Sequence, residues 1–150
     1  PSSYFGINSG YGRMFSSLPD APRKVGIIGL GAGSVIAYGR KGDTFRFYEI
    51  NPQVVDVAKR EFTFMQDTPV DDVVFRALSP EIPLPGIALV KQNRIDDAAA
   101  LFRRALDSMA GAALIILACT EVPVALRGDT ERLARRCLDP NAALAQAAAA

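Results

Sequence analysis

The sequence contains no histidine, and this absence removes several chemistries at once. Without an imidazole the chain has neither a Ser–His nor a Cys–His catalytic pair, and histidine metal sites are excluded. The two cysteines, Cys119 and Cys137, set no disulfide framework and are too few for a structural zinc site. We therefore predict a protein of the reducing cytoplasm that holds no metal.

Net charge and long apolar runs are also scarce. The formal net charge is +1, which gives no electrostatic reason to expect binding to nucleic acid or to an anionic membrane. The longest apolar run, Ala112 to Cys119, has the length of a strand and not of a membrane span. The stretch Pro1 to Gly12 is polar and glycine-rich, unlike a signal peptide. We expect neither nucleic acid nor a membrane as a partner.

The chain does contain enough material for a folded domain. Its 150 residues are 49% hydrophobic and 22% charged, which is typical of a globular protein with a buried core. The coarse order of patterns is β-α-β-α-β, a proline-rich seam, and then α-β-α-β-α. This alternation predicts an α/β fold, Rossmann-like or flavodoxin-like, with a parallel sheet of about five strands and helices on both faces.

The stretch from Lys24 to Glu49 organises the rest. An apolar run at Val25–Ile28 predicts a strand, and it leads into the glycine-rich turn Gly29-Leu30-Gly31-Ala32-Gly33-Ser34. Val35 to Tyr38 then predicts the start of a small apolar helix, and a second strand from Thr44 ends on Glu49. The order is strand, glycine turn, helix, strand, acid.

This order is typical of a nucleoside-binding corner. Glycines allow a sharp turn and the close approach of a ligand to the main chain, and a helix opening at Ala32–Ser34 would direct free N–H groups at that ligand. Glu49 lies about 20 residues past Gly29, the offset at which an acid accepts ribose hydroxyls in the dinucleotide fingerprint. We expect the turn and Glu49 to lie side by side at one edge of the sheet. A structural βαβ unit without a ligand is the alternative.

Caps and breaks divide the remaining chain. Asn51-Pro52 starts a helix whose apolar side is expected to comprise Val54, Val55, Val57, Ala58, Phe62 and Met65. Val73–Phe75 predicts a third strand. Three prolines between Leu78 and Gly86 predict an irregular linker. The first 21 residues predict a loop and a short helix over Gly12–Leu18, which we interpret as a loose terminus rather than as a wall of the site.

The second half repeats the alternation. Ile95 to Met109 predicts an amphipathic helix, and Leu114 to Ala118 predicts a buried strand. Thr120 can cap a short helix through Leu126, and a polar helix is expected from Asp129 to Arg136. Cys137-Leu138 predicts a last strand, and Asp139-Pro140 starts the final helix.

Two motif sets in the first half support a family resemblance. They are Gly6-Ile7-Asn8-Ser9-Gly10 and, around the turn, Val25 to Ser34 with Arg46 to Pro52. With these, residues 5–68 resemble spermidine-synthase-like aminopropyltransferases, which share the class I methyltransferase Rossmann fold. The resemblance implies an S-adenosylmethionine-type nucleoside, with Glu49 on its ribose and a binding set of Gly29, Gly31, Ala32, Gly33, Ser34, Glu49 and Ile50. The chain after Thr68 has neither the family's second acidic motif nor its acid-bearing catalytic loop.

The second half resembles a different family. Val90-Lys91, Gly111 to Pro123 and Asp139-Pro140 make residues 86–150 similar to the C-terminal half of cofactor-independent aspartate/glutamate racemases. The resemblance implies that Cys119 is one of two acid/base thiols beside the substrate Cα. A position between a strand and a helix N-terminus favours the thiolate, whereas the alternative for Cys119 is a small apolar residue at a strand end. Cys137 is expected to be a core residue.

The two resemblances together indicate a chimera or a recombined sequence of engineered origin. We expect one α/β domain over 1–150, built from a Rossmann-like nucleoside-binding half (1–70), a seam (69–86) and a racemase-like half (86–150). The first hypothesis for its function is weak S-adenosyl-nucleoside binding without efficient catalysis. The alternatives are a racemase-like enzyme that uses Cys119 and a spermidine-synthase-like or methyltransferase-like transferase. A small-molecule ligand and a homodimer formed through apolar helices such as Asn141–Ala150 are the expected partners.

Overall fold

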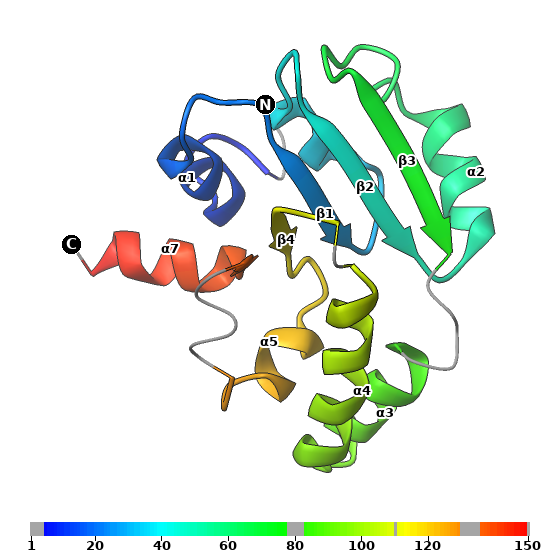
Figure 1. The fold of residues 1–150 in the computed structure, drawn as a ribbon, viewed down its shortest axis with the longest axis vertical. Helices are drawn as coiled ribbons and strands as arrows, with labels where there is room; N and C mark the ends of the chain where they lie inside the picture. Colours follow the sequence, from blue (N-terminus) through cyan, green and yellow to red (C-terminus); the bar gives the residue numbers. More distant parts are fainter. Residues whose placement is uncertain (1–4, 78–82, 110, 130–135, 150) are drawn as a thin grey trace.

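A parallel sheet with the strand order β3-β2-β1-β4-β5 forms the centre of the molecule (Figure 1). The computed structural model describes residues 5–77, 83–109, 111–129 and 136–149. Its five strands are β1 (Lys24–Ile28), β2 (Thr44–Glu49), β3 (Asp72–Ala77), β4 (Leu114–Ile116) and β5 (Cys137–Leu138). The predicted α/β fold with a parallel sheet is confirmed.

The middle strand β1 joins the two halves of the chain. It pairs with β2 on one side and with β4 on the other, so strands from before and after residues 69–86 belong to one sheet. The strand order reverses its direction at β1. Ligands of open α/β sheets bind at such a reversal, beyond the carboxyl ends of the strands.

Side chains alternate between two cores along each strand. In β1, Val25 and Ile27 belong to one buried cluster, whereas Ile28 belongs to the other. In β2, Phe45 and Phe47 lie on the same side as Val25, and Tyr48 lies opposite. Successive side chains of a strand point to opposite faces of the sheet. When both faces are covered, all of these side chains are buried, and the strand is a continuous apolar run in the sequence.

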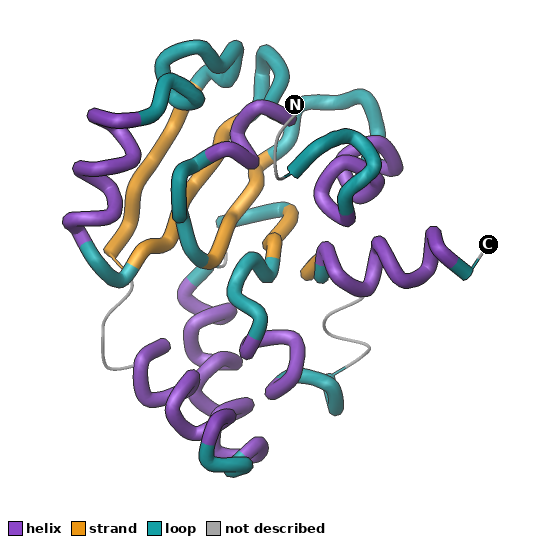
Figure 2. Tube along the Cα trace, turned by 180° about the vertical axis from the view of Figure 1, so that it is seen from behind, coloured by secondary structure: helices purple, strands orange, loops and turns teal. Residues whose placement is uncertain are grey.

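Helices cover both faces, as predicted (Figure 2). The face of Val25 is covered by α1 (Gly10–Ser17), the 3-10 helix η1 (Ser34–Tyr38), α2 (Pro52–Glu61) and α7 (Pro140–Ala148). The face of Ile28 is covered by α3 (Pro83–Lys91), α4 (Ile95–Ser108) and α5 (Glu121–Ala125). None of the helices in the described part of the chain combines the length and apolar character that crossing a bilayer demands.

The predicted helix caps at Asn51 and Asp139 are confirmed, whereas the one predicted at Thr120 is wrong, because its side chain makes no capping hydrogen bond at the start of α5. The side chain of Asn51 accepts a hydrogen bond of 3.0 Å from the backbone N–H of Gln53, and Pro52 opens α2. The side chain of Asp139 likewise accepts one of 2.9 Å from the N–H of Asn141 at the start of α7. These bonds satisfy N–H groups that have no partner inside the helix, which is why each helix begins at its proline.

The predicted linker over 78–86 is wrong for its last residues, because α3 begins at Pro83. Prolines at Pro83 and Pro85 lie in the first turn, where the backbone N–H groups have no intrahelical acceptor to lose. Residues 78–82 lie outside the described residues. So do residues 130–135, on which most of the helix expected from Asp129 falls.

Strand β4 and helix α2 are shorter than predicted. The β4 ladder ends at Ile116, because its partner β5 has two residues and pairs Leu138 with Ile116. Helix α2 ends at Glu61, and it packs through Val54, Val55 and the fully buried Ala58. Val57 does not belong to its buried side, since it is 42% exposed.

The N-terminal segment is not a loose terminus over the residues that the structure describes. The side chain of Ser9 caps α1 by accepting a hydrogen bond from the N–H of Gly12, and α1 packs against α7 (Figures 1 and 2). The two helices approach so closely that a Cβ on Gly10 would lie 1.8 Å from the carbonyl oxygen of Pro140. The hydroxyl of Tyr38 donates to the carbonyl of Phe5 at 2.5 Å and holds the preceding loop.

Candidate functional site

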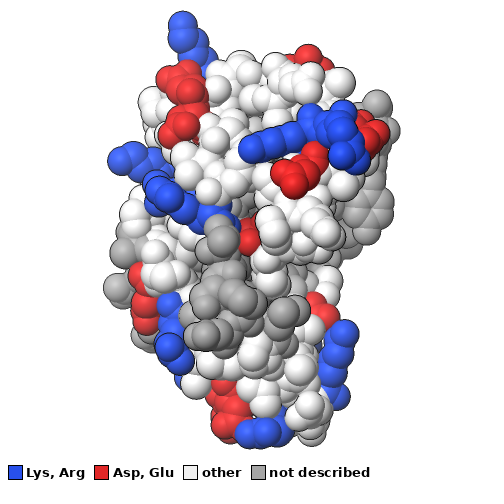
Figure 3. All heavy atoms as spheres, turned by 90° about the vertical axis from the view of Figure 1, so that its right-hand side faces the viewer, with Lys and Arg blue, Asp and Glu red and all other residues white. Residues whose placement is uncertain are grey.

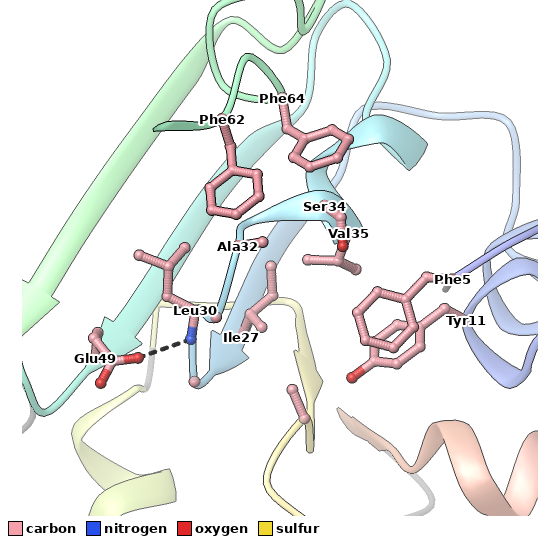
Figure 4. Close-up of a pocket in the computed structure, with 13 residues that line it drawn as sticks. Phe5, Tyr11, Ile27, Leu30, Ala32, Ser34, Val35, Glu49, Phe62 and Phe64 are labelled. Atoms are coloured by element: carbon pink, nitrogen blue, oxygen red, sulfur yellow. Dashed lines mark hydrogen bonds between the residues drawn. The ribbon is translucent and has the colours of Figure 1, made fainter. Parts of the chain in front are cut away.

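The glycine turn and Glu49 meet at the carboxyl edge of the sheet, as the sequence predicts. The N–H of Gly29 donates to the carbonyl of Tyr48 at 2.9 Å, which continues the pairing of β1 with β2 by one step. The next N–H, that of Leu30, donates to Oε2 of Glu49 at 3.0 Å (Figure 4). The carboxylate therefore holds the turn directly.

Glu49 also organises the backbone that follows it. Its Oε1 accepts hydrogen bonds from the N–H groups of Ile50 at 2.9 Å and Asn51 at 3.1 Å. A carboxylate oxygen has two acceptor positions, so Oε1 is saturated and Oε2 retains one position after its bond to Leu30. Glu49 can accept one ligand hydroxyl without giving up any of these internal bonds.

The three glycines of the turn have different tasks. All adopt left-handed backbone conformations, with φ values of +96° at Gly29, +55° at Gly31 and +76° at Gly33. No heavy atom of the described residues lies within 4 Å of the place where a Cβ would stand on Gly29 or Gly31. At Gly33 that place lies 2.5 Å from Cε of Met65. Gly29 and Gly31 thus present bare backbone to open space, and Gly33 permits packing.

The open space is a cavity of about 550 Å³ at the reversal of strand order (Figure 4). The turn after β1, Glu49 at the end of β2 and Ala118 beyond β4 form its base. The remaining lining residues are Phe5, Tyr11, Ile27, Ser34, Val35, Phe62 and Phe64. Among the described lining residues Glu49 is the only charged one, so the cavity combines an apolar wall with one carboxylate.

A second cavity of about 400 Å³ lies on the other side of the turn. It shares Gly31, Ala32 and Phe62 with the first and adds Asn51, Gln53, Val54 and Val57. Phe62 follows the end of α2 and is 38% exposed, because its ring faces these cavities rather than the core that α2 covers. A ligand in either of these two cavities would contact the ring of Phe62.

The segment after the turn differs from the prediction. It is a 3-10 helix of five residues over Ser34–Tyr38, and no α-helix opens at Ala32–Ser34. A helix dipole is the sum of many aligned peptide dipoles, so a segment of five residues has only a small dipole. The turn can offer bare backbone and a carboxylate to a ligand, but not the positive end of a long helix.

The surroundings of Cys119 oppose the thiolate that a position before a helix N-terminus favours. Burial raises the pKa of Cys119 and outweighs the backbone N–H groups of Glu121 and Val122, while the Glu121 carboxylate raises it further. The thiol donates to Oε2 of Glu121 at 3.4 Å. Both the burial and this carboxylate therefore favour the neutral thiol. Cys137 is buried, as predicted for a core residue.

Cys119 and Glu49 nevertheless line one small cavity of about 80 Å³. Ile50, Tyr48 and Phe102 line it as well, so the site residues implied by the two resemblances lie at the same edge of the sheet. Among the described residues no three side chains of His, Cys, Asp or Glu gather closely enough to hold a metal ion.

Phe5 and Tyr11, from the segment expected to be a loose terminus, form an aromatic wall of the large cavity together with Phe62 and Phe64. Phe5 and Tyr11 stand with ring centroids 4.2 Å apart, and Phe62 and Phe64 are stacked with centroids 6.1 Å apart. The signal for the first pair was the alternation of aromatics with glycines near the start of the chain. The second pair carried no local signal, because its position depends on where α2 ends.

Comparison of the chain with protein-family models, curated proteins and solved structures finds no match.

Proposed function

We propose that this α/β protein binds an S-adenosyl-type nucleoside weakly at the Gly29–Ser34 turn and does not catalyse a reaction efficiently. The observation that supports this proposal best is the cavity of about 550 Å³, which is lined by both the glycine turn and Glu49 at the reversal of strand order. A nucleoside needs an acceptor for its ribose, a close approach to backbone and an apolar surface for its base.

The residues present fit such a ligand. The free acceptor position on Oε2 of Glu49 takes a ribose hydroxyl, and the bare backbone at Gly29 and Gly31 leaves space that any side chain would fill. The ring of Phe62 offers a stacking surface to the base, with Phe64 beside it.

The same lining explains why we propose no efficient catalysis. S-adenosylmethionine supplies an electrophilic carbon next to its sulfonium when it is bound. Transfer of that carbon to an amine needs a group that removes a proton, and the one described carboxylate in the cavity, Glu49, already accepts three backbone N–H groups. An aminopropyl- or methyltransferase would need a further base.

A thermal-shift titration with S-adenosylmethionine and with methylthioadenosine tests the proposal. We expect millimolar nucleoside to raise the midpoint of unfolding of the wild-type chain, because a ligand that binds the folded state stabilises it. The shift should be lost in Glu49→Ala and kept in Glu61→Ala, whose carboxylate pairs with Arg60 on the exposed side of α2. Absence of a shift with both nucleosides would refute the proposal.

The racemase-like alternative has weaker support. Its base would be Cys119, but burial raises the pKa of this thiol, and a racemase needs a base on each side of the Cα. Exchange of the Cα hydrogen of aspartate or glutamate for deuterium, lost in Cys119→Ala, would establish it in place of our proposal.

The chimeric origin remains part of the proposal. The packing supports its feasibility, because Ile116 and Ala143 from the second half join the cluster around Phe45 and Phe47 from the first. Two α/β pieces can satisfy one core in this way when each supplies strands of the same parallel sheet.

A further inference from the structure

A cavity of a different character lies at the opposite edge of the sheet. It measures about 340 Å³ and lies where the strands begin, whereas the nucleoside cavity lies where they end. Its lining includes Lys24, Thr44, Arg46, Asp72, Gly111 and Ala112. Lys24, Thr44 and Asp72 are register partners across β1, β2 and β3, so their side chains stand on one face of the sheet.

The guanidinium of Arg46 has no hydrogen-bond or ion-pair partner among the residues that the structure describes. Its Nε is buried without an acceptor. The Nη end extends toward the cavity, since Nη1 lies 3.6 Å from the place where a Cβ would stand on Gly111. A half-buried guanidinium without a counter-ion is costly, and such a group requires an explanation.

Described backbone groups across the cavity from Arg46 are held by other residues. The guanidinium of Arg136 donates to the backbone carbonyls of Met109 and Ala112, and the N–H of Ala113 donates to the carbonyl of Lys24 at 3.0 Å. These contacts hold Ala112 and Ala113 in place beside the cavity. The cavity is the space from which a partner for Arg46 can come.

We propose that this cavity binds the phosphate or carboxylate group of a small metabolite. The Nη groups of Arg46 donate to two oxygens of the anion, and the ammonium of Lys24 and the hydroxyl of Thr44 complete the site. Asp72 is the opposing charge in the lining and limits the affinity. Acidic and basic side chains are interspersed over the face drawn in Figure 3, and the cavity itself contains Asp72 beside Lys24 and Arg46, which suits a small anion rather than a polyanion.

An NMR titration of the nitrogen-isotope-labelled protein with inorganic phosphate, and separately with acetate, tests this site. Sodium chloride at equal ionic strength is the reference. The Nε–Hε resonance of Arg46 is followed by NMR in the wild type, and the backbone N–H resonances of the lining residues Gly111 and Ala112 are followed in all variants. We expect a saturable shift with at least one of the two anions, and the anion that binds more tightly distinguishes a phosphate from a carboxylate ligand. No saturable shift with either anion would overturn the proposal.

Two variants and a control sharpen the result. Arg46→Met should weaken the binding by about tenfold or more, because it removes the charge-assisted bonds. Arg76→Met, which changes an exposed arginine on β3 outside the cavity lining, should leave it unchanged. Asp72→Asn should tighten the binding several-fold, and this gain does not depend on the folding of an arginine variant. Equal losses in both arginine variants, or no gain in Asp72→Asn, would contradict the site.

Discussion

The backbone N–H of Leu30 donates a hydrogen bond of 3.0 Å to Oε2 of Glu49, and this single contact joins the turn after β1 to the end of β2. The other oxygen of Glu49 holds the first two N–H groups beyond its own strand. A residue that the sequence marks as a ribose acceptor thus also maintains the shape of the turn on which the ribose would lie. Binding and local stability are coupled through one carboxylate.

Replacing this carboxylate should lower the stability of the free protein. Glu49→Ala leaves three backbone N–H groups without their acceptor, and we expect a loss of about 1–2 kcal/mol in the free energy of unfolding. Urea denaturation of the two proteins measures it. The control is Glu61→Ala, which removes an exposed ion pair and should change the stability by less than about 0.5 kcal/mol. Equal stability of wild type and Glu49→Ala would show that water replaces these bonds without cost.

The ion pair of Asp43 with Arg23 should be the most costly one to break. Asp43 is 1% exposed, and it accepts hydrogen bonds from the side chain and N–H of Arg23 and from the N–H of Arg40. Asp43→Asn leaves the guanidinium without its counter-ion, and we expect a loss of about 3 kcal/mol or more. The control, Asp20→Asn, breaks an exposed pair with Arg40 and should cost almost nothing.

The same carboxylate predicts how stability depends on pH. Burial acts to raise the pKa of Asp43, but the hydrogen bonds from Arg23 and Arg40 outweigh it, and the pKa is lowered. A carboxyl group with a lowered pKa stabilises the fold above its unfolded value of about 3.9, and the contribution is lost as the pH falls through the folded pKa. Unfolding measured below about pH 4 should therefore show a steeper loss of stability in wild type than in Asp43→Asn. Parallel pH curves would contradict this assignment.

The thiol of Cys119 should react slowly with iodoacetamide. Because burial and the Glu121 carboxylate raise its pKa, the pH at which alkylation reaches half its maximal rate should lie above the usual thiol value of about 8.5. Glu121→Gln should lower this midpoint, while Glu61→Gln should leave it in place. Mass spectrometry of the alkylated peptides separates Cys119 from Cys137. A midpoint below the usual value would restore the thiolate and with it the racemase-like alternative.

The contact between the first and last helices should not tolerate a methyl group. A Cβ on Gly10 would lie 1.8 Å from the carbonyl oxygen of Pro140, so Gly10→Ala has to move α1 away from α7. We expect a loss of about 1–3 kcal/mol in thermal unfolding. Gly128→Ala is the matched control, since no atom of the described residues lies within 4 Å of its added Cβ. A destabilisation of the same size in both variants would point to backbone effects instead of the helix contact.

Much of the fold could be predicted because its signals are local. The strand at Val25–Ile28, the glycine turn and the caps at Asn51 and Asp139 each depend on residues a few positions apart. The distance from Gly29 to Glu49 in the sequence follows from one βαβ unit, and parallel pairing of β1 with β2 then brings both to one edge. These features were determined by the sequence alone.

The features that were missed depend on burial by distant parts of the chain. Phe5 and Tyr11 line the large cavity because α1 packs on α7, and the raised pKa of Cys119 follows from its burial beside Glu121. Arg46, whose guanidinium has no partner among the described residues, lines a cavity together with Gly111 from a distant part of the chain. Helix propensity and strand periodicity are properties of neighbouring residues, whereas solvent exclusion and charge pairing are properties of the folded chain. Only the tertiary structure could therefore decide the walls of the cavity at the glycine turn, the surroundings of Cys119 and the place of the cavity beside Arg46.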